Sequence, residues 1–112
     1  MKQTVDYTTF QNLDIRSGTI IEAEDFPEAR KPAYKLRIDF GEEGIKQSSA
    51  QITEQYKKAD LLHKQVVAII NFPDKQIGPF RSECLVLGVE GTGEGVVLLQ
   101  PDKPVANGLP IG

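Results

Sequence analysis

One stretch of strict alternation constrains the fold of this chain most. From Tyr34 to Phe40, charged residues occupy the positions between four apolar ones, Tyr34, Leu36, Ile38 and Phe40. A period of two is typical of a β-strand with one face in a core and the other in solvent. The glycines of Gly41-Glu42-Glu43-Gly44 then predict a hairpin loop, with a returning strand over residues 45–52. This pairing predicts one surface that carries Lys35, Arg37 and Lys46.

Turn signals separate further strand-like segments along the chain. Strands are predicted over residues 14–24, 66–70, 84–89 and 96–100, a helical turn before the first, and a helical insert over residues 53–64. Gly18, in the middle of the first strand, favours a bend such as a barrel corner. A chain of 112 residues has room for one core. We therefore predict a single all-β domain over residues 1–112: a five-stranded oligonucleotide/oligosaccharide-binding barrel, with an N-terminal helical turn and a short helical insert before strand four.

The tail from Pro101 to Gly112 contains three prolines and two glycines but also apolar side chains. Such a segment is extended and cannot form a core alone. It either lies along its own barrel or pairs with another subunit.

The connection from Asn71 to Leu87 joins two apolar runs and carries unusually varied side chains. Its prolines and Gly78 should give it a defined path without helix or strand. It displays two aromatic residues, two cations and a Ser82-Glu83 pair. Loops of this kind usually bind a ligand.

Catalysis, cofactors and metal binding have little support. The serines have no histidine partner other than His63, and no Gly-x-Ser-x-Gly motif is present. We predict that the chain is not an enzyme and has no catalytic residue, cofactor or metal site. The lone Cys84 should be a packed, inert residue, and His63 a surface or edge residue. No apolar run is long enough for a membrane span, and the polar N-terminus lacks a signal-peptide core, so we expect a cytoplasmic protein without membrane insertion.

Charge is distributed unevenly along the chain. The formal net charge is −3, but residues 28–81 contain ten Lys/Arg against seven Asp/Glu, whereas the remaining segments contain three against nine. This asymmetry is compatible with one positive face on an acidic protein, and also with an ordinary mixed surface.

The candidate binding residues come from the paired strands and the long connection. Cations and aromatic faces would hold a nucleic acid, and polar groups would bind base edges or peptide amides. The alternative is that the two phenylalanines close the barrel end, while Asn71 and Ser82 fix the loop. The predicted ligand-binding residues are Lys35, Arg37, Lys46, Ser48, Gln51, Asn71, Phe72, Lys75, Phe80, Arg81, Ser82 and Glu83.

Six blocks of the sequence carry a resemblance to a known family: Asp14–Ile20, Pro32–Leu36, Asp39–Gly41, Lys46–Ile52, Asn71–Pro73 and Ser82–Glu83. In these blocks the chain resembles the stand-alone members of the tRNA-binding-domain family, above all the CsaA-like secretion chaperones. It is also similar to the C-terminal domain of methionyl-tRNA synthetases. The resemblance implies a homodimeric oligonucleotide-binding barrel with no catalysis of its own.

Two segments differ from the pattern of the tRNA-binding relatives: Ser48-Ser49-Ala50-Gln51-Ile52 and Ser82-Glu83-Cys84-Leu85. These differences favour a chaperone that binds unfolded or pre-secretory polypeptide for export, with residual tRNA binding and the export machinery as a further partner. The alternative is a tRNA-binding module that acts alone or in trans with an aminoacyl-tRNA synthetase. A third hypothesis is a dimerisation domain without a ligand.

Overall fold

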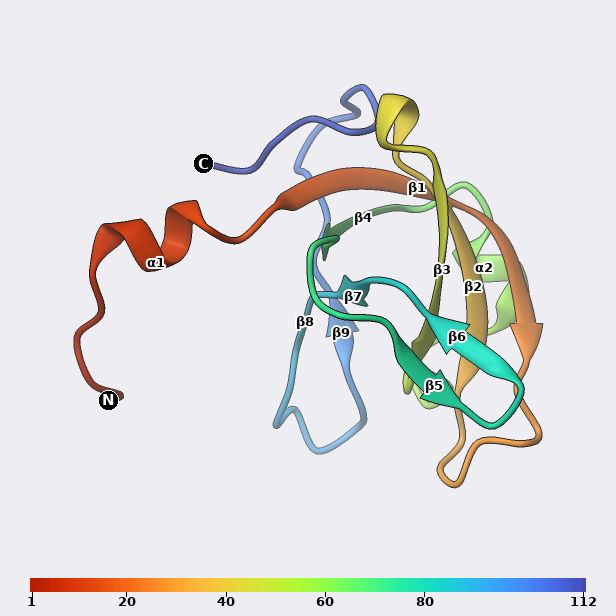
Figure 1. Ribbon diagram of the computed structural model, residues 1–112. Coiled ribbons are helices and arrows are strands. Elements are labelled where there is room, and N and C mark those ends of the chain that lie inside the picture. The colour runs from red at the N-terminus through yellow and green to blue at the C-terminus, as the bar shows by residue number, and fades with distance from the viewer.

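The computed structural model describes residues 1–112. Its centre is an antiparallel sheet in the order β3-β2-β1-β4-β7, which curls into a nearly closed barrel (Figure 1). The barrel strands are β1 (Ile15–Asp25), β2 (Tyr34–Asp39), β3 (Ile45–Ala50), β4 (Gln65–Ile69) and β7 (Leu85–Val86). Two hairpins stand beside it, formed by β5 (Lys75–Ile77) with β6 (Phe80–Ser82) and by β8 (Gly88–Val89) with β9 (Val97–Leu98). The helices are α1 (Tyr7–Gln11), the 3₁₀ turn η1 (Gly41–Glu43) and α2 (Lys58–Leu61). The predicted barrel, N-terminal helical turn and helical insert before the fourth barrel strand are confirmed.

The core is built on the alternating side chains of β2. Leu36, Ile38 and Phe40 are fully buried, as the period of two predicts. The side chains of β2 pack directly against Gly18 of β1, where a Cβ atom would lie 2.7 Å from Ile38 Cγ2 and 2.8 Å from Phe40 Cδ1. The register then shifts between Ile20 and Glu22, as at a β-bulge. Both features let the long first strand bend around the barrel.

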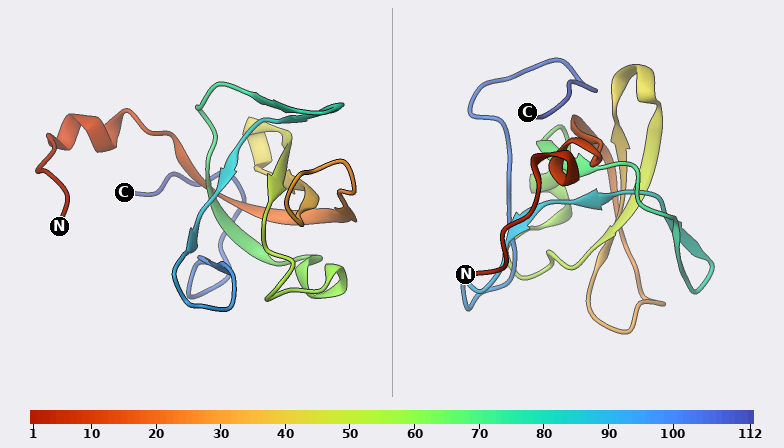
Figure 2. Two further views of the ribbon diagram at one scale, coloured as in Figure 1. Left: turned by 90° about the horizontal axis from the view of Figure 1, so that it is seen from below. Right: turned by 60° about the vertical axis from the view of Figure 1, so that its left-hand side comes forward.

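The C-terminal tail lies along its own barrel, so the first of the two predicted alternatives is confirmed (Figure 2). Ser17 is the main attachment point: its N–H donates to Leu109 O at 3.0 Å, and its C=O accepts from Gly108 N at 2.7 Å. The Ser17 hydroxyl donates to Ala106 O and accepts from Leu109 N. The tail thereby pairs with the part of β1 that β2 does not cover.

The predicted strand over residues 84–89 is broken at Leu87, and this part of the prediction was wrong. Leu87 donates its N–H to Val67 O in β4, and its C=O accepts from Leu99 N after β9. The chain therefore changes pairing partner at this residue. Strand β7 completes the barrel, while β8 leaves it to form the hairpin with β9.

Helix α1 projects from the barrel beside the C-terminus (Figures 1 and 2). None of its residues is buried, and Tyr7 is 70% exposed. The ring of Tyr7 lies 6.0 Å from that of Phe10, which is half-buried. Neither α-helix has the length and apolar character that crossing a membrane would require.

Candidate functional site

The outer face of β1 and β2 carries two of the predicted cations, and each is paired with a carboxylate. Arg37 Nε lies 3.6 Å from Glu22 Oε2, and Lys35 Nζ lies 4.0 Å from Glu24 Oε2. These are cross-strand neighbours in the register of the sheet. A hollow of about 260 Å³ lies over this face and is bordered by Phe80 of the neighbouring hairpin. The face is therefore charged but close to neutral, which agrees with the mixed surface that the sequence left open and not with a positive face.

Lys46 and Ser48 do not belong to this outer face, so their predicted placement was wrong. In the β2–β3 register they are partners of Ile38 and Leu36, whose side chains point into the barrel. Residues opposite one another in an antiparallel pair share a face. Ser48 is only 1% exposed, and its hydroxyl donates to Cys84 O at 2.9 Å. Ser48 therefore holds the barrel together, and a bound ligand cannot reach it.

The connection from Asn71 to Leu87 contains regular structure that the sequence analysis did not predict. Strands β5 and β6 form a short hairpin, and Ile77 pairs with Phe80 on either side of a Gly78-Pro79 turn. Gly78 has φ +55°, a conformation that glycine adopts without steric cost. Two residues thus make the turn, and the flanking residues are extended enough to pair.

The base of this connection is fixed by Asn71. Its side-chain amide donates to Asn12 O at 2.8 Å, and its Oδ1 accepts from Asp14 N at 2.9 Å. Both bonds tie the connection to the chain just before β1. This geometry supports the alternative reading of Asn71 as a residue that fixes the loop.

Ser82 and Glu83 hold the far end of the connection against the edge of β3. Glu83 Oε1 accepts from Gln47 N at 3.0 Å, and Glu83 N donates to Gln47 O at 2.8 Å. Ser82 Oγ accepts from Ser49 N at 3.1 Å. Because β3 is an edge strand, these contacts satisfy backbone groups that would otherwise face solvent. They also join the edge of the sheet at β3 to the segment just before β7, which nearly closes the barrel.

The aromatic and cationic side chains of the connection have different environments. Phe72 is exposed, whereas the Phe80 ring packs edge-on against buried Phe26 at 5.2 Å. Arg81 is largely exposed, and its Nη1 lies 3.6 Å from Asp74 Oδ2. Lys75 has no ion-pair partner. Lys35, Arg37 and Arg81 are thus paired with carboxylates, and Lys75 alone among these four predicted cations carries an uncompensated charge.

A groove of about 360 Å³ lies between the end of β3, the β5–β6 hairpin and the β7–β9 region. We call it the apolar groove because eight of its fourteen lining residues are apolar. Of the predicted residues, Gln51, Lys75 and Ser82 lie on its wall. Leu85 is 47% exposed and available for contact. The sequence analysis missed the groove because its lining comes from separate segments, each of which looks like ordinary core. Its apolar lining is Ala50, Ile52, Ile77, Cys84, Leu85, Val86, Val96 and Leu98.

Cys84 lies in the wall of the apolar groove as a packed, 7% exposed residue, which confirms its prediction. Burial raises the pKa of its thiol to about 12, against an ordinary value of 9.0, and the hydrogen bond with Ser48 opposes this rise only in part. The thiolate fraction at pH 8 is correspondingly small. Burial and the small thiolate fraction together predict an unreactive cysteine in the folded protein.

We expect native Cys84 to react with iodoacetamide at pH 8 at least a hundredfold more slowly than the same residue in denaturant, because both burial and the raised pKa suppress the thiolate. Mass spectrometry of the alkylated chain measures both rates. Raising the pH from 8 to 10 should speed the native reaction without a plateau. Equal alkylation rates in the native and denatured protein would contradict the burial of Cys84 in the wall of the apolar groove.

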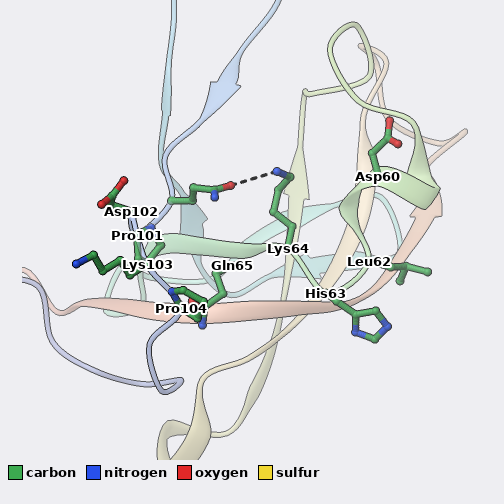
Figure 3. A pocket seen from close by; sticks show the side chains of 10 residues that line it. Asp60, Leu62, His63, Lys64, Gln65, Pro101, Asp102, Lys103 and Pro104 are labelled. Carbon is green, nitrogen blue, oxygen red and sulfur yellow. Dashed lines mark hydrogen bonds between the residues drawn. The ribbon is translucent and has the colours of Figure 1, made fainter.

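A separate polar hollow of about 410 Å³ lies between α2, the start of β4 and the tail (Figure 3). Lys64 Nζ donates to Gln100 Oε1 across it at 3.2 Å. His63 is exposed and points away from its neighbours, which confirms its surface location. None of the residues that line this hollow was predicted to bind a ligand.

Comparison with known proteins identifies the family. Residues 15–110 match the model of a family described as "Putative tRNA binding domain". The chain belongs to the tRNA-binding-domain family. Its fold is shared with crystal structures of the chaperone CsaA. The CsaA of Bacillus anthracis str. Ames is 51% identical, with a TM-score of 0.92, and the match covers 98% of this chain and 100% of that one.

A second CsaA structure, from Picrophilus torridus, is 53% identical with a TM-score of 0.92, over 97% of this chain and 100% of that one. The predicted resemblance to the CsaA-like members of the family and the predicted barrel are thus confirmed. Methionine–tRNA ligases match as well: the enzyme of Thermococcus onnurineus is 37% identical over 107 residues. That match covers 96% of this chain but 14% of the enzyme, so it concerns one appended domain of the ligase.

Proposed function

We propose that this protein is a non-catalytic chaperone that binds unfolded or pre-secretory polypeptides in the cytoplasm and assists their export. The observation that carries the proposal is the apolar groove beside a charge-paired face. Eight apolar side chains line the groove. Two structures about half identical to this chain are of the chaperone CsaA, which supports the chaperone part of the proposal.

Each part of the binding surface has a role in this proposal. Leu85 and its apolar neighbours in the groove take the apolar side chains of a polypeptide, whose burial is favourable by about 25 cal/mol per Å². Gln51 and Lys75 on the rim bind its backbone carbonyls. Asn71, Ser82 and Glu83 act indirectly, because their hydrogen bonds hold the walls in place.

Binding of tRNA is the second candidate function, and it rests on the family match over residues 15–110. Lys35, Arg37 and Arg81 lie on the exposed side where RNA would bind. Each is within 4.0 Å of a carboxylate, so a phosphate must compete with Glu24, Glu22 or Asp74. We therefore infer that tRNA binds weakly and that polypeptide is the principal ligand.

Replacing Leu85 by glutamate tests the groove directly. Leu85 is half exposed, so the charge should be tolerated by the fold but should repel an apolar ligand. We expect the Kd for an unfolded precursor polypeptide to rise about tenfold or more, since a buried leucine side chain contributes on the order of 2 kcal/mol. Leu99→Glu is a matched control, because Leu99 is similarly exposed but lies outside the groove. Equal affinity of L85E and wild type would refute the site.

We also propose that the protein is a homodimer whose interface contains α1 and the tip of the tail. A hollow of about 490 Å³ lies between these segments. Tyr7, Leu109 and Ile111 expose apolar surface close to it. Two-fold pairing of this region would bury apolar groups that the isolated barrel leaves in solvent.

We therefore expect the wild type to be dimeric and the double variant Tyr7→Glu, Ile111→Glu to be monomeric. Both side chains are exposed, so the fold should persist, and light scattering after size-exclusion chromatography measures the mass. Val97→Glu, on the β8–β9 hairpin, provides an exposed apolar control. A double variant that remains a dimer would exclude this interface.

A further inference from the structure

A pocket of about 440 Å³ lies between the β1–β2 loop and the β5–β6 hairpin. Its wall carries three cations, Arg30, Lys31 and Lys75, and one carboxylate, Glu28. We call it the cationic pocket. None of its three cations forms an ion pair, whereas Lys35, Arg37 and Arg81 on the neighbouring surface each do. Its positive charge is therefore available to a ligand.

The cationic pocket adjoins the apolar groove. The two hollows share four lining residues, Ser49, Gln51, Lys75 and Ile77. The single carboxylate of the groove, Glu90, directly follows β8 and does not line the cationic pocket. One extended ligand can thus occupy an apolar region and then meet unpaired positive charge.

We propose that this arrangement selects apolar polypeptide segments flanked by acidic residues over the same segments flanked by basic residues. The inference rests on the proposed function and specifies its ligand. Charges separated by less than a Debye length of about 8–10 Å interact appreciably, so nearby Arg30 and Lys31 outweigh the net charge of the whole chain for a flank bound there. Signal peptides carry a positively charged segment before their apolar core. The preferred ligands are therefore apolar segments of the mature polypeptide.

Three peptides with one apolar core and different flanks test this selection. The flanks are a pair of aspartates, a pair of serines or a pair of lysines, and the Kd of each is measured by fluorescence anisotropy at low and high salt. At low salt we expect the aspartate peptide to bind about tenfold more tightly than the lysine peptide, with a smaller ratio at high salt. In the variant Arg30→Gln, Lys31→Gln the ratio should fall to near one, while the serine peptide keeps its Kd.

Lys103→Gln, on the tail far from the groove, is the control and should keep the wild-type ratio. Equal binding of all three peptides, tighter binding of the lysine peptide, or an unchanged ratio in the double variant would overturn the inference but leave the proposed polypeptide binding intact. Failure of every peptide to bind would instead overturn the proposed function and the inference with it.

Discussion

Gly18→Ala should lower the free energy of unfolding by about 2 kcal/mol, because the added methyl group would overpack the core beside Ile38 and Phe40. The new Cβ would lie 2.7 Å from Ile38 Cγ2 and 2.8 Å from two atoms of the Phe40 ring. Both neighbours are fully buried and cannot move aside without disturbing the core. Urea denaturation followed by circular dichroism measures the change.

Glu24→Ala is the control for this experiment. It lies on the same strand but is exposed, and its ion pair with Lys35 is long and solvated. We expect the free energy of unfolding of the Glu24→Ala protein to differ from that of wild type by no more than about 0.5 kcal/mol. A Gly18→Ala protein as stable as wild type would show that Ile38 and Phe40 do not pack against Gly18 as closely as described.

Glu22→Gln combined with Glu24→Gln should raise the affinity for bulk tRNA about tenfold at low salt. The double change frees Arg37 and Lys35 from their carboxylate partners without altering side-chain shape. Each freed cation that reaches a phosphate also steepens the salt dependence, by a slope of roughly 0.7–0.9. Filter binding or anisotropy over a salt series measures both quantities.

The matched control is Glu42→Gln with Glu54→Gln, which removes the same net charge from exposed residues elsewhere. It should raise tRNA affinity much less, because Lys35 and Arg37 keep their carboxylate partners and the face of β1 and β2 stays nearly neutral. If both double variants gain equally, overall charge governs tRNA binding, and local pairing of Lys35 and Arg37 does not.

The sequence predicted those parts of the fold that depend on local patterns. Strict alternation from Tyr34 to Phe40 identified both the strand and its buried face, because a half-buried strand repeats every second residue. Gly18 marked the bend in the first strand. The glycines at 41 and 44 marked the hairpin that follows.

The face of β3 was not predictable in the same way. Its sequence, Ile45-Lys46-Gln47-Ser48-Ser49-Ala50, has no clear alternation of apolar and polar residues. Without that pattern the register depends on the turn at η1, and a shift by one residue exchanges the two faces of a strand. The register observed pairs Lys46 with Ile38 and directs it away from Lys35 and Arg37.

The binding surface was predictable only in part, because it depends on contacts between distant segments. Loop composition pointed to the connection after Asn71, but it did not reveal that Ser82 and Glu83 are engaged by β3. Nor does a list of cations show that Glu22 lies beside Arg37, since their pairing follows from a bulge in β1. Such pairing makes this face nearly neutral, whereas the charge distribution along the sequence was compatible with both a positive face and a mixed surface.

The salt dependence of binding tests most directly whether polypeptide is the principal ligand. Purified protein is titrated with an unfolded precursor polypeptide and with bulk tRNA, each at low and at high salt. We expect polypeptide affinity to change little with salt, since apolar burial carries it, and tRNA affinity to be weaker and to fall steeply. Tight tRNA binding that persists at high salt, together with no measurable binding of the polypeptide, would contradict the proposed function.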